Sequence, residues 1–378
     1  MVSRLLSALE TRIARTRDPL QNDCLRAERT TLLARQGRLD EARAELARIR
    51  ARHAAKPDAV LTAWVCLGEG MVAFFASLTL SARDKFLRAH ALSTASGSRA
   101  VRCISAGWLA HIGYLEQDFQ SMARYVDIVL VEESLNDGSA MERACLVVGQ
   151  AYHWADRFDL AQPWYERARA HANSIGDETL LSALLHNMTW LHVAQERRRS
   201  LLAQFDEQRG SRILFGAEAT ESFDALVGTA SLKSLVPILH AHVLSLLGRH
   251  GEALALFDKH LGQALSEGLS RLECSVFAEL AWCQASVGAL TEAAKSATAS
   301  QEKMRECTQP DELAAAHGRL AQCYRILGND HASALHADQS VSELTRLARR
   351  QATAISLLAE SEFVTPRTGD PRNQAGTP

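Results

Sequence analysis

The sequence has few aromatic residues and little proline, and it contains none of the short motifs that mark common enzyme classes. Aromatic residues make up 6% of the chain, and only five of its eight prolines precede the last fifteen residues. Alanine, leucine and arginine dominate instead, which is typical of helical proteins. The motifs GxxxxGK, GxGxxG, GxSxG and HExxH are all missing. We therefore expect a helical protein that is not an enzyme and that binds no cofactor.

No excess charge of one sign points to a nucleic acid or to an anionic membrane. The net charge is −2 and the isoelectric point is near 6.7. Residues 1–15 alternate Leu and Ile with Arg and Glu at helical spacing, unlike the uninterrupted apolar stretch of a signal peptide. No later segment approaches the roughly 18 apolar residues of a membrane span. We expect a cytoplasmic protein with neither a nucleic-acid nor a membrane partner.

Cysteine pairs and clustered metal ligands are also lacking. The eight cysteines include no CxxC pair, so we interpret them as small buried residues rather than as a disulfide or metal framework. Among the fourteen histidines, only His331 and His336 place two rings on one helical face, and no third ligand of matching spacing is nearby. Ordinary surface histidines are favoured over a metal site there. The basic run at residues 197–199 is interpreted as solvated surface rather than as a phosphate site.

What the sequence does contain is a repeat. A glycine-containing turn segment follows an apolar helical run at Gly37 and recurs at Gly248, Gly288 and Gly328, the last three about 40 residues apart. The residues that open the second helix of each unit are Ala42, Ala82, Met122, Ala161, roughly Leu201, Ala253, Ala293 and Ser333. The step between the fifth and sixth units is longer by about a dozen residues. The chain is thus predicted to hold eight helical hairpins with an insertion near residues 206–222.

Each unit has a physical explanation in the packing of a hairpin. A glycine such as Gly37 can adopt the left-handed conformation that ends the first helix, and the acidic residues after it favour the N-terminus of the second. Ala161, Tyr165 and Ala168 lie at positions i, i+4 and i+7, on one helical face. A small residue upstream, such as Gly149, is placed where the two helices cross and lets them approach closely.

The pattern of small and aromatic residues at Gly149, Phe158, Ala161, Tyr165 and Ala168 resembles the tetratricopeptide repeat (TPR). The resemblance covers about residues 20–345. Because this repeat is near 40 residues rather than the usual 34 or so, it is similar to the long-repeat, MalT-like variety, which is also found in peptide-responsive bacterial regulators. The resemblance implies an all-α fold, a right-handed superhelical α-solenoid of about eight antiparallel helical hairpins.

The two ends and the insertion complete the expected organisation. Terminal repeats of a solenoid need polar-faced caps, so we expect an N-terminal capping helix in residues 1–19 and a C-terminal capping helix in residues 346–361. Residues 362–378 are rich in proline and nearly devoid of apolar residues, which predicts a disordered tail. The insertion at residues 206–222 is flanked by glycines and is interpreted as a loop that either packs over the solenoid or contacts a ligand.

In TPR folds the first helix of each hairpin lines the concave side of the superhelix, so the repeat register predicts a binding groove. The predicted groove residues are Trp64, Met71, Phe74, Phe75, His111, Tyr114, Arg143, Gln150, His153, Trp154, His186, Trp190, His242 and Trp282. Four of the six tryptophans fall in this set, which favours an exposed or partly exposed ligand surface. The alternative is that these aromatic residues fill the space between hairpins, as Trp108 and Trp164 are expected to do.

The composition of the groove limits what it could hold. TPR proteins that clamp an acidic C-terminus use paired Lys and Asn, and the projected positions hold neither. An apolar helix or extended segment suits the groove better, so the leading hypothesis is a scaffold or adaptor that binds a protein or peptide partner. The alternative is a regulatory module that senses a ligand or peptide and acts on a separate output protein. The oligomeric state stays open.

Overall fold

The computed structural model describes residues 3–77, 82–133, 140–227, 235–266 and 269–361. Within these ranges the chain forms 17 α-helices and one short 3-10 helix, and no β-strand. The elements are α1 (Arg4–Arg15), α2 (Pro19–Arg35), α3 (Leu39–His53), α4 (Ala59–Ser77), α5 (Arg83–Ser96), α6 (Arg99–Leu115), α7 (Phe119–Glu133), α8 (Met141–Trp154), α9 (Phe158–Ile175), α10 (Glu178–Leu201), α11 (Glu207–Val227), α12 (Leu235–Leu246), α13 (His250–Ser266), η2 (Leu269–Leu272), α14 (Glu273–Ser286), α15 (Leu290–Met304), α16 (Pro310–Ile326) and α17 (Asp330–Glu360).

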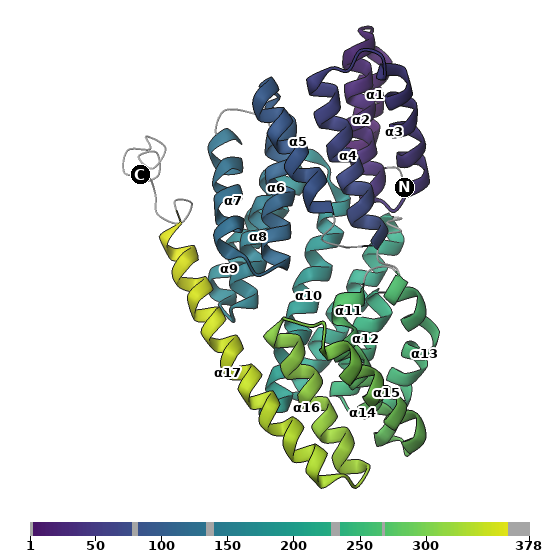
Figure 1. Cartoon of the computed structure of the whole chain (residues 1–378), viewed down its shortest axis with the longest axis vertical. Helices are drawn as coiled ribbons and strands as arrows, with labels where there is room; N and C mark the ends of the chain where they lie inside the picture. The colour runs from purple at the N-terminus through teal and green to yellow at the C-terminus, as the bar shows by residue number, and fades with distance from the viewer. Residues whose placement is uncertain (1–2, 78–81, 134–139, 228–234, 267–268, 362–378) are drawn as a thin grey trace.

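Consecutive helices pair into hairpins that stack along the chain. The described residues contain eight hairpins, whose first helices are α2, α4, α6, α8, α10, α12, α14 and α16. Each first helix also contacts the first helix of the next hairpin, so these helices form one continuous layer. Figure 1 shows the purple and blue hairpins stacked above the green ones. The architecture is the all-α solenoid that the sequence predicts.

The turns between paired helices use a residue in the left-handed conformation. Gly248 has φ 73°, and the backbone N–H groups of this glycine and of the next residue donate to carbonyls of the preceding helix at 3.0 and 2.9 Å. Gln117 and Asp156 occupy the same turn position with φ 57° and 59°, although neither is glycine. Both side chains make long-range contacts, described below, that a glycine could not make.

The two helices of a hairpin cross at a small residue that faces an aromatic ring. A Cβ atom placed on Gly70 would lie 2.6 Å from Phe86 Cδ1, and one placed on Gly149 would lie 2.8 Å from Tyr165 Cδ1. Interiors are packed too densely to absorb such overlaps without a shift of the backbone. Glycine is therefore required at these two crossings.

The fifth hairpin differs from its prediction. Leu201 ends α10 rather than opening the second helix of the hairpin, and residues 206–222 lie almost wholly in α11 instead of in a loop. Gly210 suggests a break, but a glycine inside a helix costs only about 1 kcal/mol relative to alanine. Ile213 and Leu214 pack against the apolar cluster shared with α12, which offsets that cost. The longer repeat step thus comes from two long helices.

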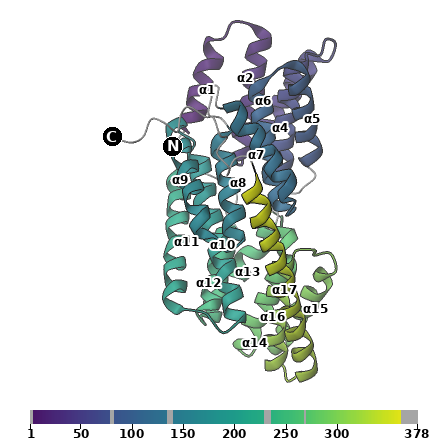
Figure 2. The same cartoon turned by 90° about the vertical axis from the view of Figure 1, so that its left-hand side faces the viewer.

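The C-terminal helix returns to the middle of the solenoid. α17 is continuous from Asp330 to Glu360, so the predicted capping segment at residues 346–361 is the second half of one long helix. Figures 1 and 2 show this yellow helix running along one side of the molecule to α7 and α8, both of which it contacts. At the other end α1 buries Leu6, Leu9 and Ile13. The predicted tail at residues 362–378 lies outside the described residues.

Helix α4 corrects one further expectation. Its window Ala59–Ala76 is long and apolar enough to cross a membrane, contrary to the prediction that no segment approaches that length. The same helix packs against α2, α5 and α6, and 61% of the window is buried inside the protein. A core helix buried on most of its surface needs the same apolar composition as a membrane span.

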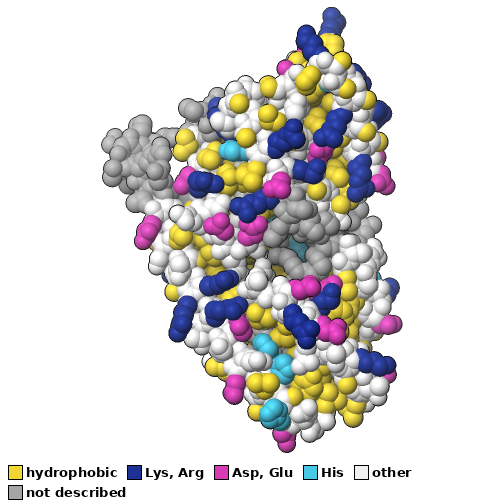
Figure 3. Space-filling view, viewed as in Figure 1, with side chains coloured by type: hydrophobic (Ala, Val, Ile, Leu, Met, Phe, Trp, Pro, Cys, Tyr) yellow, Lys and Arg dark blue, Asp and Glu magenta, His cyan; other side chains and the backbone are white. Residues whose placement is uncertain are grey.

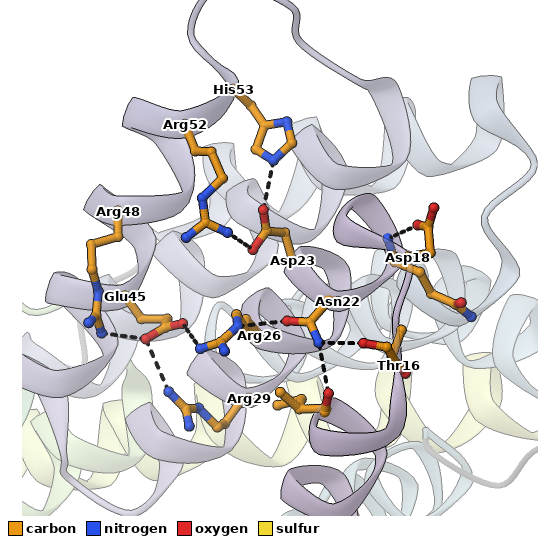
Figure 4. A network of polar contacts seen from close by, with 12 residues as sticks. Thr16, Asp18, Asn22, Asp23, Arg26, Arg29, Glu45, Arg48, Arg52 and His53 are labelled. Atoms are coloured by element: carbon orange, nitrogen blue, oxygen red, sulfur yellow. Dashed lines mark hydrogen bonds and ion pairs between the residues drawn. The ribbon is translucent and has the colours of Figure 1, made fainter.

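The first hairpin is held by a polar network between α2 and α3 (Figure 4). Asp23 is fully buried and lies 2.8 Å from His53 Nε2, and it also pairs with Arg52. Glu45 is buried beside two arginines of α2 and one of α3. Buried carboxylates require such partners. These contacts tie together the helices of a terminal hairpin, which has a neighbour on one side only.

Candidate functional site

The first helices of the hairpins line a cavity of about 190 Å³. Its walls come from α2, α4, α6, α8, α10, α12 and α16, together with η2. The predicted groove residues that line it are Phe74, Phe75, His111, Tyr114, Arg143, Gln150, Trp154, His186 and Trp190. On the face of the molecule seen in Figure 3, by contrast, basic and acidic side chains are interspersed with apolar ones. The aromatic residues of the concave layer thus gather around an interior space.

The remaining predicted residues lie elsewhere. Trp64 and Met71 line a second cavity, under α1. His153, His242 and Trp282 line neither cavity. These three side chains serve the packing between helices, which is the alternative that the sequence left open.

One wall of the cavity is a cluster of aromatic rings from α4 and α6. The ring of Phe74 lies 5.1 Å from that of Trp108 and 5.7 Å from that of His111, both with edge-to-face geometry. Arg143 stacks over Trp108 with its guanidinium carbon 4.3 Å from the ring centre. Trp108 was expected to lie away from the groove, yet it both packs between hairpins and lines the cavity. Trp108 therefore takes part in the packing between hairpins and in the wall of the cavity at the same time.

Two buried polar atoms at the cavity have no hydrogen-bond partner within the described part of the chain. They are Oε1 of Gln150, a residue that is 3% exposed, and Nδ1 of His186, which is 8% exposed. Burial lowers the pKa of His186 to about 4, so its ring is neutral near pH 7. A buried polar atom without a hydrogen bond destabilises the folded protein, so the lack of a partner at each of these two atoms calls for an explanation.

The cavity is bridged by contacts between hairpins that are far apart in the sequence. Trp154 Nε1, at the end of α8, donates to Asp311 Oδ2, in the first turn of α16, at 3.0 Å. Beside it, Gln309 Nε2 donates to the carbonyl of Leu115 at 3.0 Å. The concave side is therefore a partly open cavity that these contacts bridge at one edge.

Helix α17 reinforces this bridge from outside. Arg350 Nη1 donates to Gln117 Oε1 at 2.8 Å, and Gln351 Nε2 donates to the carbonyl of Trp154 at 2.6 Å. Gln117 is one of three non-glycine residues with a left-handed conformation in the described turns, together with Asp156 and Ala203. Asp156 accepts from Arg198 Nη2 at 2.7 Å. Side chains at these turns thus hold the third and fourth hairpins to distant helices.

The lower half of the solenoid contains a buried ionic cluster around Glu279. Arg197 Nε lies 3.3 Å and Arg319 Nε 3.1 Å from its carboxylate, and His242 Nδ1 lies 3.8 Å away. The neighbouring Arg319 holds the pKa of Glu279 well below its usual range, against the effect of burial. The interpretation of residues 197–199 as solvated surface is wrong for Arg197 and Arg198, which are buried.

The histidine pair on α17 does not form a shared site. His336 is buried and its Nδ1 lies 2.8 Å from His317 Nδ1, whereas His331 is exposed. Across the described ranges, no three His, Cys, Asp or Glu residues are grouped so that they could hold a metal ion.

Comparisons with known proteins bear on the fold. No protein-family profile and no curated protein match the sequence. Among solved structures, the chain is similar to a Rap protein complexed with Competence and Sporulation Factor, with a TM-score of 0.54 and 13% identity over 88% of this chain and 100% of that one. The fold is a TPR-like helical repeat. At this identity the likeness extends to the fold alone.

Proposed function

We propose that this chain is a non-enzymatic binding module that holds a short segment of a protein or peptide partner in the cavity on its concave side. The proposal rests on two buried polar atoms without hydrogen-bond partners, Oε1 of Gln150 and Nδ1 of His186, which lie between the aromatic walls of the cavity. A bound segment would supply the missing hydrogen bonds and bury an apolar side chain among the rings. That a Rap protein of similar fold was solved in complex with a factor supports partner binding by this architecture.

The size of the cavity sharpens the expected ligand. A cavity of about 150 Å³ is known to hold benzene, so about 190 Å³ suits one or two side chains rather than a whole helix. The titratable groups nearby have structural partners: Asp311 accepts from Trp154, and Arg35 pairs with Asp177 at 2.7 Å. This supports recognition of an extended segment by shape and hydrogen bonds, without a catalytic step.

A regulatory role is the second candidate, and one contact favours it. Trp154 both lines the cavity and bridges it through Asp311, so a ligand that moves its indole ring would also strain the bridge between α8 and α16. Such a module would pass the change to a separate output protein. The repeat length near 40 residues supports assignment to the long-repeat, MalT-like variety. The eight cysteines, six of them buried, support a reducing, cytoplasmic compartment.

Selection from a displayed library of random peptides on the immobilised full chain tests the proposal. We expect peptides whose affinity falls about tenfold or more in the Gln150→Leu, His186→Leu double variant, because two buried hydrogen bonds are lost. The matched control is Gln162→Leu, His331→Leu, which changes the same residue types at exposed positions. Peptides that bind all three proteins equally, or a selection that yields none, would contradict the cavity as the binding site.

A further inference from the structure

A second and larger cavity, of about 640 Å³, lies beneath α1. Its walls come mainly from α1, α2, α4, α6 and α8, and most of the wall is apolar, as at Leu9, Leu25, Trp64, Met71 and Ile104. This volume falls in the range of roughly 300–1,000 Å³ that suits a small organic ligand. The first cavity is much smaller, so the two spaces would take different ligands.

Seven acidic or basic side chains line this cavity: Arg12, Glu28, Arg35, Arg99, Glu142, Arg143 and Asp177. Four of them, Arg35, Glu142, Arg143 and Asp177, lie where α2 ends and where α8 and α10 begin. Arg35 Nη2 donates to both carboxylate oxygens of Asp177, at 2.7 and 2.9 Å, and Asp177 also accepts the backbone N–H of Leu180 at 2.9 Å. Both carboxylate oxygens of Asp177 therefore have hydrogen-bond partners. Arg143 is buried against Trp108. Glu142 is 3% exposed, and its Oε2 has no hydrogen-bond partner in the ranges that the structure describes.

The charge of this wall favours an anion. Burial, together with the nearby carboxylate of Asp177, raises the pKa of Glu142 to about 8, so this side chain is neutral near pH 7. Arg35 and Arg143 then contribute two positive charges and Asp177 one negative charge. Along the rest of the wall Arg12 lies 3.8 Å from Glu28, and Arg99 adds a further cation, so positive charges outnumber negative ones. Burial and the neighbouring Arg35 lower the pKa of Arg143 to about 9, as expected for a cation without a full counter-charge.

We propose that this cavity binds a small amphiphilic carboxylate, with its carboxylate between Arg143 and the neutral carboxyl of Glu142 and its apolar chain along Trp64 and Met71. A carboxylate supplies a negative charge, which complements the excess of positive charge on the wall. Its two oxygens can accept one hydrogen bond from a guanidinium and one from a carboxyl O–H. The apolar part of the ligand would replace water along the aromatic and aliphatic walls. This site shares Arg35, Trp108 and Arg143 with the small cavity, but it needs no partner segment bound there.

Calorimetric titration of the full chain at pH 7 with dodecanoate tests the proposal, and dodecanol and dodecyltrimethylammonium serve as probes of equal chain length. We expect dodecanoate to bind, Arg143→Met to weaken it about tenfold or more through loss of a charge-assisted hydrogen bond, and Glu142→Gln to keep the affinity within about threefold. Equal or tighter binding of the neutral or cationic probe, or no binding of dodecanoate, would overturn it.

A second readout does not depend on the stability of the Arg143 variant. Trp64 and Trp108 line this cavity, so 12-bromododecanoate should quench their fluorescence, and Trp64→Phe should remove part of that quenching. Raising the pH from 7 to 8 should weaken binding to the wild type more than binding to Glu142→Gln, because Glu142 loses its proton near pH 8 whereas Arg143 stays mostly charged. The charged groups that face Glu142 are Arg35, Arg143 and Asp177. Quenching that Trp64→Phe leaves intact would place the ligand elsewhere and overturn the assignment.

Discussion

Trp154 and Asp311 are separated by 157 residues, yet the indole N–H of one donates to the carboxylate of the other at 3.0 Å. The first residue ends the first helix of the fourth hairpin, and the second begins the first helix of the eighth. Their contact joins two parts of the superhelix that are separated in the sequence by the fifth, sixth and seventh hairpins. It also bridges the concave surface at one edge of the cavity.

Replacing Trp154 with Phe tests how much this contact contributes. Trp154→Phe keeps an aromatic ring at the cavity but removes the donor to Asp311, so we expect a loss of about 1–3 kcal/mol in the free energy of unfolding. Urea denaturation followed by circular dichroism measures it. Trp164→Phe, on the outward helix α9, is the control for the loss of an indole and should cost less. Equal losses in the two variants would show that the hydrogen bond is unimportant.

Replacing glycine with alanine should have opposite effects on stability at two positions, because only one of the two glycines lies where the helices of a hairpin cross. Gly70→Ala places a methyl group 2.6 Å from the ring of Phe86 and should destabilise the protein by about 1–3 kcal/mol. Gly262→Ala, inside α13 where the new Cβ meets nothing within 4 Å, should stabilise it by about 0.5–1 kcal/mol. Thermal unfolding of the two variants provides the comparison. A stabilised Gly70→Ala protein would refute the packing described for α4 and α5.

The raised pKa of Glu142 predicts a dependence of stability on pH. The folded protein keeps this proton up to about pH 8, while the unfolded chain releases it near the ordinary value of 4.5. The contribution of this group to the free energy of unfolding is therefore fully present below about pH 4.5. It falls by about 1.4 kcal/mol for each pH unit between the pKa of the unfolded chain and that of the folded protein. Glu142→Gln should abolish that fall, so the variant should gain on the wild type as the pH rises from 5 to 8. Parallel pH profiles in denaturant would contradict the raised pKa.

The buried cluster around Glu279 should be far more sensitive than the surface pairs. Glu279→Gln leaves Arg197 and Arg319 buried without their carboxylate, and we expect a loss of about 3–5 kcal/mol. Glu41→Gln, which breaks the exposed pair with Arg38, is the matched control and should leave the urea midpoint nearly unchanged. Similar midpoints for the two variants would mean that the cluster is not a structural centre.

Local periodicity accounts for what could be predicted from the sequence. The glycine turns and the crossings such as that between Gly149 and Tyr165 depend on residues within one hairpin, so their spacing reveals the hairpins and the inward faces of α4, α6 and α8. The prediction for the fifth hairpin is wrong because Gly210 is tolerated inside a helix in which Ile213 and Leu214 are partly buried against α12.

The far wall of the cavity could not be predicted in the same way. Gln309 and Asp311 reach α6 and α8 only because small rotations between successive repeats add up to a closed turn, and no single repeat encodes that sum. The burial of Arg197 has the same origin, since its partner Glu279 belongs to a different hairpin. The sequence around a basic run next to a predicted turn does not show that an acidic partner lies in another hairpin.

Hydrogen–deuterium exchange of the full chain, with and without a peptide selected against it, tests the central claim most directly. If the peptide occupies the cavity on the concave side, protection should rise in residues 143–154 of α8, in residues 182–194 of α10 and around residues 309–312, which line the cavity and bridge it. Protection confined to the outer helices α9, α13 and α15, with these segments unchanged, would contradict the account.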